Sequence, residues 1–339
     1  MSFVAHIESS GREMSIEPEE TILAAALRQG IALPYGCRAG QCGACKATLL
    51  VGAVDYGHKS PTALNPEEQK SGVILPCLAV PRTDLDLQVR EVKKNQDIPI
   101  RILPCRVVKK EFLAPDVLRL FIKVPESDRL SFLPGQYIEF LLSNNRHRSF
   151  SLANSPRNNE LLELHVRHVP GGSFTSWLFQ EMPENSLLRI QGPLGSFSFQ
   201  EKSTRPVILI AGGTGFSPVK SILEYAFAEK TSRSFHLYWG ARTRRDLYLD
   251  ELPRFWEQHY PYFRYTPVLS RPTAEDGWEG RVGRVPTMVV ADYPDLSRYE
   301  VYACGPPPMV ATGLETFIAH GLSRDHYHAD AFEYSKKDG

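Results

Sequence analysis

The pattern of hydrophobic and polar positions divides the chain into three parts, the first of which covers residues 1–90. Two short apolar stretches, FVAHI and EMSI, lie on either side of a Ser-Ser-Gly turn and predict a pair of strands. A dense apolar run, ILAAALRQ, follows Thr21 and predicts a helix that ends at Gly30. The glycine-rich loop YGCRAGQCGAC comes next and precedes a further strand, KATLLVG. This order predicts a small unit of mixed helix and strand.

The second part begins after a polar stretch, residues 91–99, which has no apolar periodicity and is predicted to be a linker. From about residue 100 to 200 the chain carries short alternating apolar stretches: CRVVKKEF, VLRLFIKV, QYIEFLL, LLELHVRHV and SLLRIQG. Turn-forming pairs such as Pro134-Gly135 and Gly171-Gly172 separate them. Several short strands at this spacing predict an antiparallel barrel.

The third part, from about residue 205, alternates between apolar strands and longer helical patterns. Its expected strands are PVILIAGG, FHLYWGA, FRYTPVLS and YEVYACG. Helices are expected over PVKSILEYAFAEK, near LDELPRFWEQHY and over MVATGLETFIAHG. Strand–helix alternation is typical of a parallel, doubly wound sheet.

Charge and composition narrow the classes of function. The chain has 339 residues, with 39 basic and 39 acidic side chains, so its formal net charge is zero. That balance gives no electrostatic case for binding nucleic acid or an anionic membrane surface. The first residues lack the apolar core of a signal peptide, and no apolar run is long enough to cross a membrane. We therefore expect a cytoplasmic protein.

The cysteines are distributed unevenly, which favours a metal site over disulfides in a cytoplasmic protein. Four of the six lie in the first quarter of the chain: Cys37, Cys42, Cys45 and Cys77. Their spacing, C-x4-C-x2-C followed by a distant fourth cysteine, is the plant-type [2Fe–2S] pattern. A thioredoxin-type pair would not need the third cysteine upstream, and a structural zinc site usually has two paired knuckles. We expect the four thiolates to hold a [2Fe–2S] cluster.

Residues 1–93 resemble a plant-type ferredoxin domain in the segment YGCRAGQCGACKA and the later ILPC. The resemblance implies a β-grasp fold. The next segment, residues 99–202, resembles the FAD-binding barrel of the ferredoxin–NADP reductase superfamily, whose signature is Arg-x-Tyr-Ser. Here that signature is Arg148-Ser149-Phe150-Ser151. By resemblance, Arg148 would pair with the FAD pyrophosphate, Phe150 would stack on the isoalloxazine and Ser151 would approach the flavin N5 edge.

The segment HVRHVPGGSFTSWLF extends this resemblance to the beginning of a short helix, where free N–H groups suit a phosphate. The flavin contacts expected here are Val166, Gly172, Ser173, Phe174 and Thr175. Taken alone, Thr175 is equally a hydroxyl that serves the helix N-terminus. His168 is expected to face solvent and not to act as a base.

Residues 203–339 resemble the nucleotide domain of the same superfamily in three segments. These are the glycine loop IAGGTGFSP, the segment CGPPPM and the near-terminal DAF. The residues expected at the nicotinamide are Gly212, Gly213, Thr214, Gly215, Ser217, Pro218, Cys304, Gly305, Pro306, Met309 and Phe332. By resemblance, Cys304 would lie near the nicotinamide C4 and Phe332 would cover the outer flavin face. By chemistry alone Cys304 is a buried small hydrophobe and Phe332 a C-terminal plug.

The segment YWGARTRRDLY resembles the NADH-using branch, although its arginines would also suit a 2′-phosphate. We expect NADH in preference to NADPH, with the nucleotide contacted by Arg242, Asp246, Ser270 and Arg271.

The order of the parts implies an enzyme in which hydride passes from NADH to FAD and single electrons pass from FAD to the [2Fe–2S] cluster and on to a partner enzyme. Ser151, Cys304 and Phe332 would be the residues nearest the reacting atoms. The segments GVILPC, HLYWGAR, VYACG and YHADAF resemble the CDP-6-deoxy-Δ3,4-glucoseen reductases, which work with a pyridoxamine-dependent sugar dehydrase. Reductase components of aromatic or alkane oxygenases are the alternative, and a redox-responsive binding protein without turnover is a third class.

Overall fold

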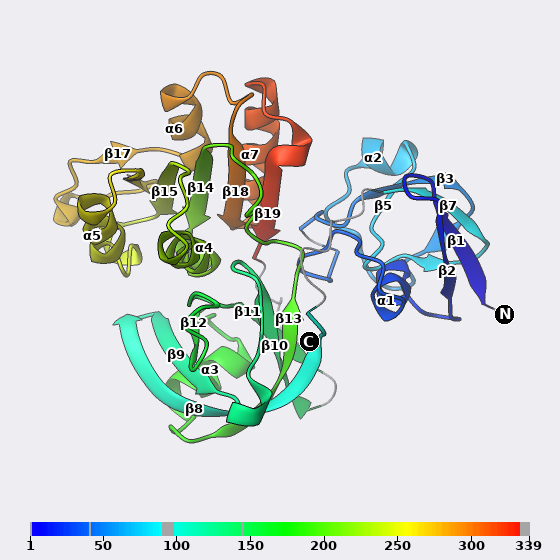
Figure 1. Cartoon of the computed structure of the whole chain (residues 1–339), viewed down its shortest axis with the longest axis horizontal. Helices are drawn as coiled ribbons and strands as arrows, with labels where there is room; N and C mark the ends of the chain where they lie inside the picture. The colour runs from blue at the N-terminus through cyan, green and yellow to red at the C-terminus, as the bar shows by residue number, and fades with distance from the viewer. Residues whose placement is uncertain (1, 41, 90–97, 144–145, 333–339) are drawn as a thin grey trace. The chain divides into compact units, whose positions relative to one another are not determined.

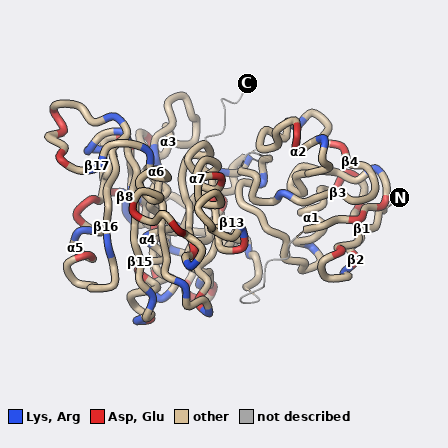
Figure 2. The backbone as a smooth tube through the Cα atoms, turned by 90° about the horizontal axis from the view of Figure 1, so that it is seen from above, with Lys and Arg blue, Asp and Glu red and all other residues tan. Residues whose placement is uncertain are grey.

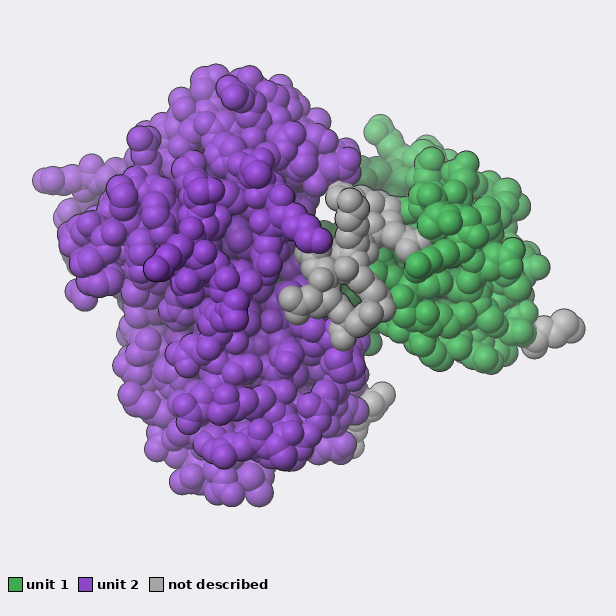
Figure 3. Space-filling view, viewed as in Figure 1, with its two compact units in different colours: residues 1–97, 195–197 green, residues 98–194, 198–339 purple. Residues whose placement is uncertain are grey.

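The computed structural model describes residues 2–40, 42–89, 98–143 and 146–332. Most of the linker predicted over 91–99 lies outside these residues. The chain forms two compact units, one of residues 1–97 with 195–197 and the other of residues 98–194 with 198–339 (Figure 3). The ferredoxin-like part is thus a unit of its own, whereas the barrel and the nucleotide-binding part belong to one unit.

The first unit is built on a mixed five-stranded sheet of order β2-β1-β7-β3-β5. Strand β1 pairs with β7 in parallel and with β2 antiparallel, the pattern of a β-grasp fold. The Thr21 hydroxyl accepts the amide of Ala24 at the start of helix α1, and Gly30 adopts a φ of 70° just after its end, as the sequence predicts. The elements are β1 (Phe3–Ile7), β2 (Arg12–Ile16), α1 (Ile22–Arg28), β3 (Ala47–Val51), β4 (Val54–Asp55), α2 (Pro66–Lys70), β5 (Val73–Ile74), β6 (Val80–Pro81) and β7 (Leu85–Gln88).

An antiparallel six-stranded barrel of order β11-β10-β13-β8-β9-β12 opens the second unit. A bridge between Leu152 and Leu164 joins the two outer strands, so the sheet closes on itself. Alternate residues of β12 fill the interior, where Leu162, Leu164 and Val166 are fully buried. The elements are β8 (Arg101–Ala114), β9 (Val117–Lys123), β10 (Tyr137–Leu141), β11 (His147–Ser151), β12 (Leu162–Arg167), α3 (Ser173–Gln180) and β13 (Leu187–Leu194).

A fully parallel sheet of order β17-β16-β15-β14-β18-β19 completes the second unit. Helices α4 and α5 lie on one face, and α6 and α7 lie together on the other (Figure 1). The chain moves outward from β14 in both directions, so the strand order reverses between β14 and β18. The elements are β14 (Val207–Gly212), α4 (Phe216–Ala228), β15 (Phe235–Ala241), α5 (Glu251–His259), β16 (Phe263–Leu269), β17 (Arg281–Val282), α6 (Val285–Asp292), β18 (Glu300–Gly305), α7 (Pro307–Ala319) and β19 (Tyr327–Ala331).

The predicted fold class is confirmed: a multidomain chain with a β-grasp unit, an antiparallel barrel and a doubly wound parallel sheet. The pattern did not reveal α6, β17 or β19, because β17 has only two residues and β19 mixes polar and apolar positions. Acidic and basic residues are interspersed along the described chain (Figure 2). Among the described residues no helix has the length and apolar character that a membrane span requires.

Candidate cofactor sites

The cysteine loop turns its backbone amides toward its own sulfur atoms. The amide of Cys37 donates to Cys42 Sγ, and the amides of Cys42 and Ala39 donate to Cys37 Sγ, each at 3.4 Å. Such N–H···S bonds stabilise thiolate charge and tune the potential of an iron–sulfur cluster. The loop therefore has the polarity that a cluster of thiolate ligands requires.

Three residues give the loop its tight course by adopting left-handed backbone angles. These are Arg38, Gly40 and Gly43, with φ values of 57°, 75° and 70°. Gly36, the first glycine of the loop, has no positive φ. A Cβ added at Gly40 would lie 2.2 Å from Leu78 Cδ1, so this position has no room for a side chain.

The four sulfurs form two pairs that suit a two-iron cluster. A hydrogen bond with Cys37 and burial raise the pKa of Cys42, and in the same way a hydrogen bond with Cys77 and burial raise the pKa of Cys45. Thiols placed so closely resist double ionisation unless a cation neutralises them. Among the described residues, no three His, Cys, Asp or Glu side chains gather as ligands of a single ion. Two thiolates for each of two irons fit this donor set.

The segment expected to bind flavin lies along β11 beside an aromatic cluster. Phe150 is half-buried, and its ring centroid lies 5.8 Å from that of Phe140 and 6.0 Å from that of Phe174. The guanidinium of Arg148 donates to the carbonyl of His147 at 2.9 Å. Ser151 is buried and ends the strand. This arrangement leaves Phe150 with an aromatic backing on which a planar ring can stack.

The beginning of helix α3 is shaped by Thr175. Its Oγ1 accepts the amide of Val169 at 3.1 Å and lies close to a Cβ built on Gly172, at 3.0 Å. Thr175 therefore organises the turn before the helix, while Ser173 is exposed at the helix start and Phe174 is buried. The side chain of Val166 is buried inside the barrel, so only its backbone is available to a cofactor.

His168 does not simply face solvent, as the sequence suggests. It lies one residue beyond β12, is half-buried, and its Nε2 is 3.2 Å from the Ser176 hydroxyl. Its ring centroid is 5.1 Å from that of Phe179. These contacts give His168 a packing role at the first turns of α3.

The residues expected at the nicotinamide meet at the carboxyl ends of β14 and β18, where the strand order reverses. A Cβ on Gly215 would lie 2.1 Å from the carbonyl oxygen of Cys304, and one on Gly212 would lie 2.6 Å from Pro306 Cδ. Gly305 has a φ of 144°, and a Cβ built on it would lie 2.9 Å from the Cα atom of Gly212. The glycines therefore let two loops of this chain contact each other, in addition to any approach of a dinucleotide. Around this contact, Thr214 and Met309 are half-buried, and Ser217 and Pro218 are buried.

Cys304 is fully buried, and burial, together with the nearby Asp330 charge, raises the pKa of its thiol well above the ordinary value. The thiol is therefore protonated at neutral pH. The amide of Phe332 donates to the carbonyl of Gly305 at 2.9 Å, which ties the end of β19 to the Cys304-Gly305 loop. The structure thus brings the three nicotinamide segments together.

The expected nucleotide contacts lie side by side at the ends of β15 and β16. Ser270 donates to the Ala241 carbonyl from its amide and hydroxyl, and the Arg271 amide donates to the Arg242 carbonyl. Arg242 and Arg271 are both exposed. Asp246 accepts the amide and hydroxyl of Thr243 at 3.0 and 3.1 Å, so its carboxylate organises this turn.

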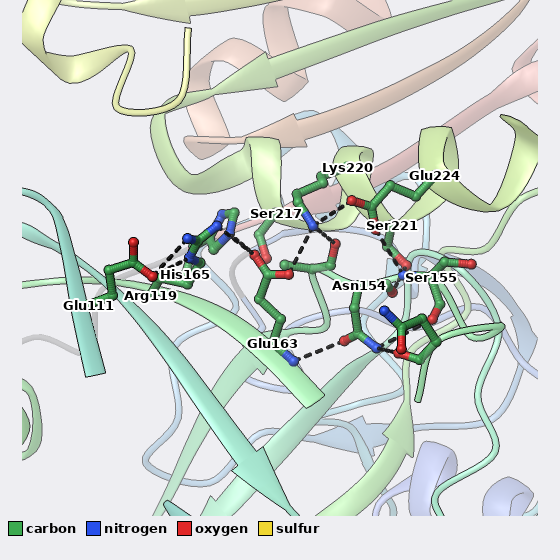
Figure 4. A network of polar contacts seen from close by, with 12 residues as sticks. Glu111, Arg119, Asn154, Ser155, Glu163, His165, Ser217, Lys220, Ser221 and Glu224 are labelled. Carbon is green, nitrogen blue, oxygen red and sulfur yellow. Dashed lines mark hydrogen bonds and ion pairs between the residues drawn. The ribbon is translucent and has the colours of Figure 1, made fainter. Parts of the chain in front are cut away.

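Sequence patterns missed a buried polar network between the barrel and α4 (Figure 4). Glu163 and His165 from β12 and Lys220 from α4 are its central residues, all of them buried. The only trace of it in the sequence is the polar alternation of β12, which predicts an outward-facing row but not the partner.

Three family models match successive parts of the chain. They are described as a 2Fe-2S iron-sulfur cluster binding domain, over residues 5–82, an oxidoreductase FAD-binding domain, over 104–199, and an oxidoreductase NAD-binding domain, over 209–313. Over 99% of its length the chain is 37% identical to the CDP-6-deoxy-L-threo-D-glycero-4-hexulose-3-dehydrase reductase of Yersinia pestis, all of which is covered. The chain is an iron–sulfur flavoprotein reductase of the ferredoxin–NADP reductase superfamily.

Two further similarities show the range of this reductase family. The terephthalate 1,2-dioxygenase reductase component 1 of Comamonas sp. is 33% identical, with 99% of this chain and 98% of that protein covered. The crystal structure of the Amycolatopsis cytochrome P450 reductase GcoB superposes with a TM-score of 0.79 at 34% identity, over 98% of this chain and all of that one. These relatives supply electrons to different kinds of enzyme.

The reductase uses FAD, NADH and a [2Fe–2S] cluster, and it transfers electrons to a partner enzyme. From their position near the C-terminus, His326, His328, Asp330 and Glu333 are expected to be solvated polar residues. Those that the structure describes are not simply solvated. His328 on β19 is half-buried and its Nε2 lies 3.0 Å from a Glu300 carboxylate oxygen. Glu333, considered with them, lies outside the described residues.

Proposed function

We propose that this reductase supplies electrons to a pyridoxamine-dependent dehydrase acting on a CDP-4-keto-6-deoxy sugar. The observation that carries the proposal is the similarity to the Yersinia pestis dehydrase reductase, which extends over both compact units and over the whole length of that relative. Identity to the terephthalate dioxygenase reductase component is lower, at 33% against 37%.

Each group of residues has a proposed task. Cys37, Cys42, Cys45 and Cys77 ligate the cluster through the two sulfur pairs described above. Arg148 places its positive charge beside the FAD pyrophosphate, and the Phe150 ring stacks on the flavin. Arg242, Asp246, Ser270 and Arg271 contact the nucleotide at the ends of β15 and β16. The remaining contacts proposed for the flavin and the nicotinamide are the residues at the α3 N-terminus and around the Gly215–Cys304 contact.

When bound, FAD supplies the conversion between two-electron hydride chemistry and the single electrons that a [2Fe–2S] cluster carries. The chain contributes position and polarity. Cys304 and Ser151 are proposed at the nicotinamide and flavin edges, where burial excludes water from the transfer. Phe332, held by its backbone to Gly305, is proposed to cover the flavin until nicotinamide replaces it.

An oxygenase component is the second candidate partner. The specific observation in its favour is the TM-score of 0.79 with the cytochrome P450 reductase GcoB over nearly the whole chain. This comparison measures the similarity of the backbone around the protein's own cofactors. That similarity does not distinguish one electron acceptor from another.

The test is an anaerobic coupling assay with purified holoprotein, NADH, a pyridoxamine-dependent CDP-sugar dehydrase and its 4-keto-6-deoxy substrate. Deoxysugar product that depends on this reductase, and that forms faster with NADH than with NADPH, is the expected result. The control replaces the dehydrase by an oxygenase component and its aromatic substrate and is run in air-saturated buffer, because an oxygenase needs dioxygen as its co-substrate.

Each outcome separates the candidates. Hydroxylated product without deoxysugar product would replace the dehydrase by an oxygenase as the partner. If NADH reduced neither flavin nor cluster, and no reduction of ferricyanide or cytochrome c followed, the reductase activity itself would be contradicted and a redox-responsive binding protein would be favoured.

A further inference from the structure

The outward-facing row of β12 meets the nucleotide-binding part of the second unit. Leu162, Leu164 and Val166 point into the barrel, so the alternate residues Glu163 and His165 point outward, and yet both are buried. They are covered by α4, which begins directly after the Gly213–Gly215 loop. A carboxylate and an imidazole, each with less than a tenth of its surface exposed, need partners to offset their lost hydration.

One face of α4 supplies those partners, at the i, i+3, i+4, i+7 spacing of a single helical stripe. Lys220 Nζ donates to Glu163 Oε2 at 2.9 Å, forms an ion pair with Glu224 at 2.8 Å, and lies 3.2 Å from the Ala153 carbonyl oxygen. The hydroxyls of Ser217 and Ser221 donate to the carbonyls of Ser151 and Asn154 at 3.0 and 2.7 Å. Figure 4 shows these side chains converging from α4 on the segment that follows β11.

Strand β12 of the barrel also forms hydrogen bonds with the segment that follows β11. The Ala153 amide donates to the Glu163 carbonyl at 2.8 Å, and the Glu163 amide donates to Asn154 Oδ1 at 2.9 Å. Residues 151–155 therefore lie between β12 and α4, with Lys220 contacting both the segment and Glu163. The segment begins at Ser151, the last residue of the proposed flavin motif.

We propose that Lys220, paired with Glu163, is a positioning residue for hydride transfer: it locks α4 onto residues 151–155 and so fixes the nicotinamide loop relative to the flavin motif. Gly215 lies one turn and a half before Lys220 on the same rigid backbone, and Ser151 lies two residues before Ala153. A displacement at Lys220 thus reaches both sites through short, stiff connections. Hydride transfer is sensitive to such shifts, because misplacement by about 1 Å costs on the order of 100-fold in rate.

The electrostatics agree with an ionised Glu163 carboxylate at this contact. Burial raises the pKa of Glu163, but the His165 hydrogen bond and the Lys220 charge outweigh it and lower this pKa to about 2. Burial lowers the pKa of His165, so its ring is neutral. His165 Nε2–H then donates to Glu163 at 2.9 Å, and Nδ1 accepts the Tyr248 hydroxyl at 3.0 Å. Arg119, itself paired with Glu111, lies 3.9 Å from Glu163 and completes the charges around the carboxylate.

The inference rests on the proposed placement of the flavin and nicotinamide, and its test uses the intact holoprotein. Lys220→Met removes the ammonium group and keeps most of the side-chain volume. The double variant Glu163→Gln with Lys220→Met also removes the carboxylate charge that the single variant leaves without its lysine partner. Arg157→Met is the matched control, because Arg157 pairs with Glu229 just beyond the end of α4 from the same barrel loop but is exposed.

Three quantities test the proposal for each variant, whose melting temperature is recorded as well. Anaerobic stopped-flow gives the rate constant for flavin reduction by NADH, and the long-wavelength charge-transfer absorbance reports stacking of nicotinamide on flavin. Hydrogen exchange of the Ala153 and Ser155 amides, followed by mass spectrometry, reports on the segment itself. FAD and iron contents of each preparation show that the cofactors are retained.

The double variant gives the decisive result. We expect its thermal stability to return near that of the parent protein while flavin reduction stays about 10- to 100-fold slower, with weaker charge-transfer absorbance and faster amide exchange. Arg157→Met should stay within about twofold of the parent rate. A double variant that reduces flavin at the parent rate would show that Lys220 only neutralises Glu163, and the positioning role would be overturned. Failure of the parent protein itself to show NADH-dependent flavin reduction would instead contradict the proposed function.

Discussion

The cysteine loop and the contact between the barrel and α4, both of which we propose to position a redox group, are built in different ways. In the loop, three of the four cysteines fall within nine residues, and backbone angles at Arg38, Gly40 and Gly43 set their direction. At the α4 contact, the working pair is Glu163 and Lys220, which are separated by 57 positions. A site built from neighbouring residues can be identified from spacing, whereas a site built by side chains across two folds becomes visible only in three dimensions.

This comparison predicts that damage to the loop stays local. Cys42→Ser should abolish the visible absorbance and electron paramagnetic resonance of the cluster, because one of four thiolates is lost. Reduction of flavin by NADH should continue at the parent rate, since the loop belongs to the other compact unit. Cys105→Ser is the control, as Cys105 is a lone buried cysteine in β8. Loss of flavin reduction in Cys42→Ser would break the distinction between the two regions.

Arg148→Ala tests the flavin motif, which belongs to the second compact unit. Removing a charge-assisted contact to phosphate should weaken FAD binding by about 10- to 100-fold, while the cluster content is unchanged. The measurement is FAD retained after gel filtration, together with the dissociation constant from fluorescence titration of the apoprotein. Arg189→Ala, which removes an exposed arginine of β13, serves as the control. Equal FAD content in both variants would remove Arg148 from the site.

Gly215→Ala tests whether the close contact between the glycine loop and Cys304 requires glycine at this position. The new Cβ would lie 2.1 Å from the Cys304 carbonyl oxygen, which is backbone and cannot turn aside. We expect a loss of about 3 kcal/mol in the free energy of unfolding of the second unit. All four tryptophans lie in that unit, so their fluorescence in urea reports on it alone. Gly277→Ala, with φ of 51° but open space around it, should cost only about 1 kcal/mol. Because Gly215 has an ordinary helical φ of −57°, equal losses would show that the Cys304 loop yields to the added methyl group and that the contact does not require glycine.

The smallest expected effect concerns Glu300, which pairs with His328 and Arg233 at the opposite end of the parallel sheet. Burial raises its pKa, but these partners lower it to about 2, below the ordinary value of 4.5. A carboxylate with a depressed pKa stabilises the fold above the unfolded value and loses that contribution as the pH falls. Between pH 5 and pH 3 we expect about 2 kcal/mol to be lost through this group.

Tryptophan fluorescence at a series of pH values, for the parent and for Glu300→Gln, measures this loss. The difference between the two proteins should shrink as the pH falls from 5 to 3. A constant difference would assign the acid sensitivity of the second unit to other carboxylates, of which Glu163 is the next to examine.

The sequence predicts most of this fold, because strand and helix patterns in the barrel and the parallel sheet are strong and regular. The strand FHLYWGA coincides with β15, and the run after Thr21 with α1 to within one residue. Strand β19 was not predicted as a strand, since it is stabilised by pairing with β18 and not by a local apolar pattern.

The candidate sites also divide into those with a local sequence signal and those that depend on residues far apart in the chain. Cysteine spacing is a local signal, and so is the Arg148–Ser151 motif. In contrast, Lys220 looks like an ordinary surface lysine of an amphipathic helix, because nothing near it in sequence indicates a buried carboxylate. The steric role of Gly215 is equally hidden, as it depends on Cys304, which follows 89 positions later.

The Glu163–Lys220 pair also bears on how proteins of this kind can be recombined. A chimera that takes its barrel from one reductase and its parallel sheet from another would bring together two faces that never evolved against each other. If either donor lacked its residue of the pair, the remaining charge would be buried between the barrel and the parallel sheet without its partner. Exchange of the ferredoxin-like unit cuts no such pair within the second unit, so that boundary is the natural place for a gene fusion or an engineered swap.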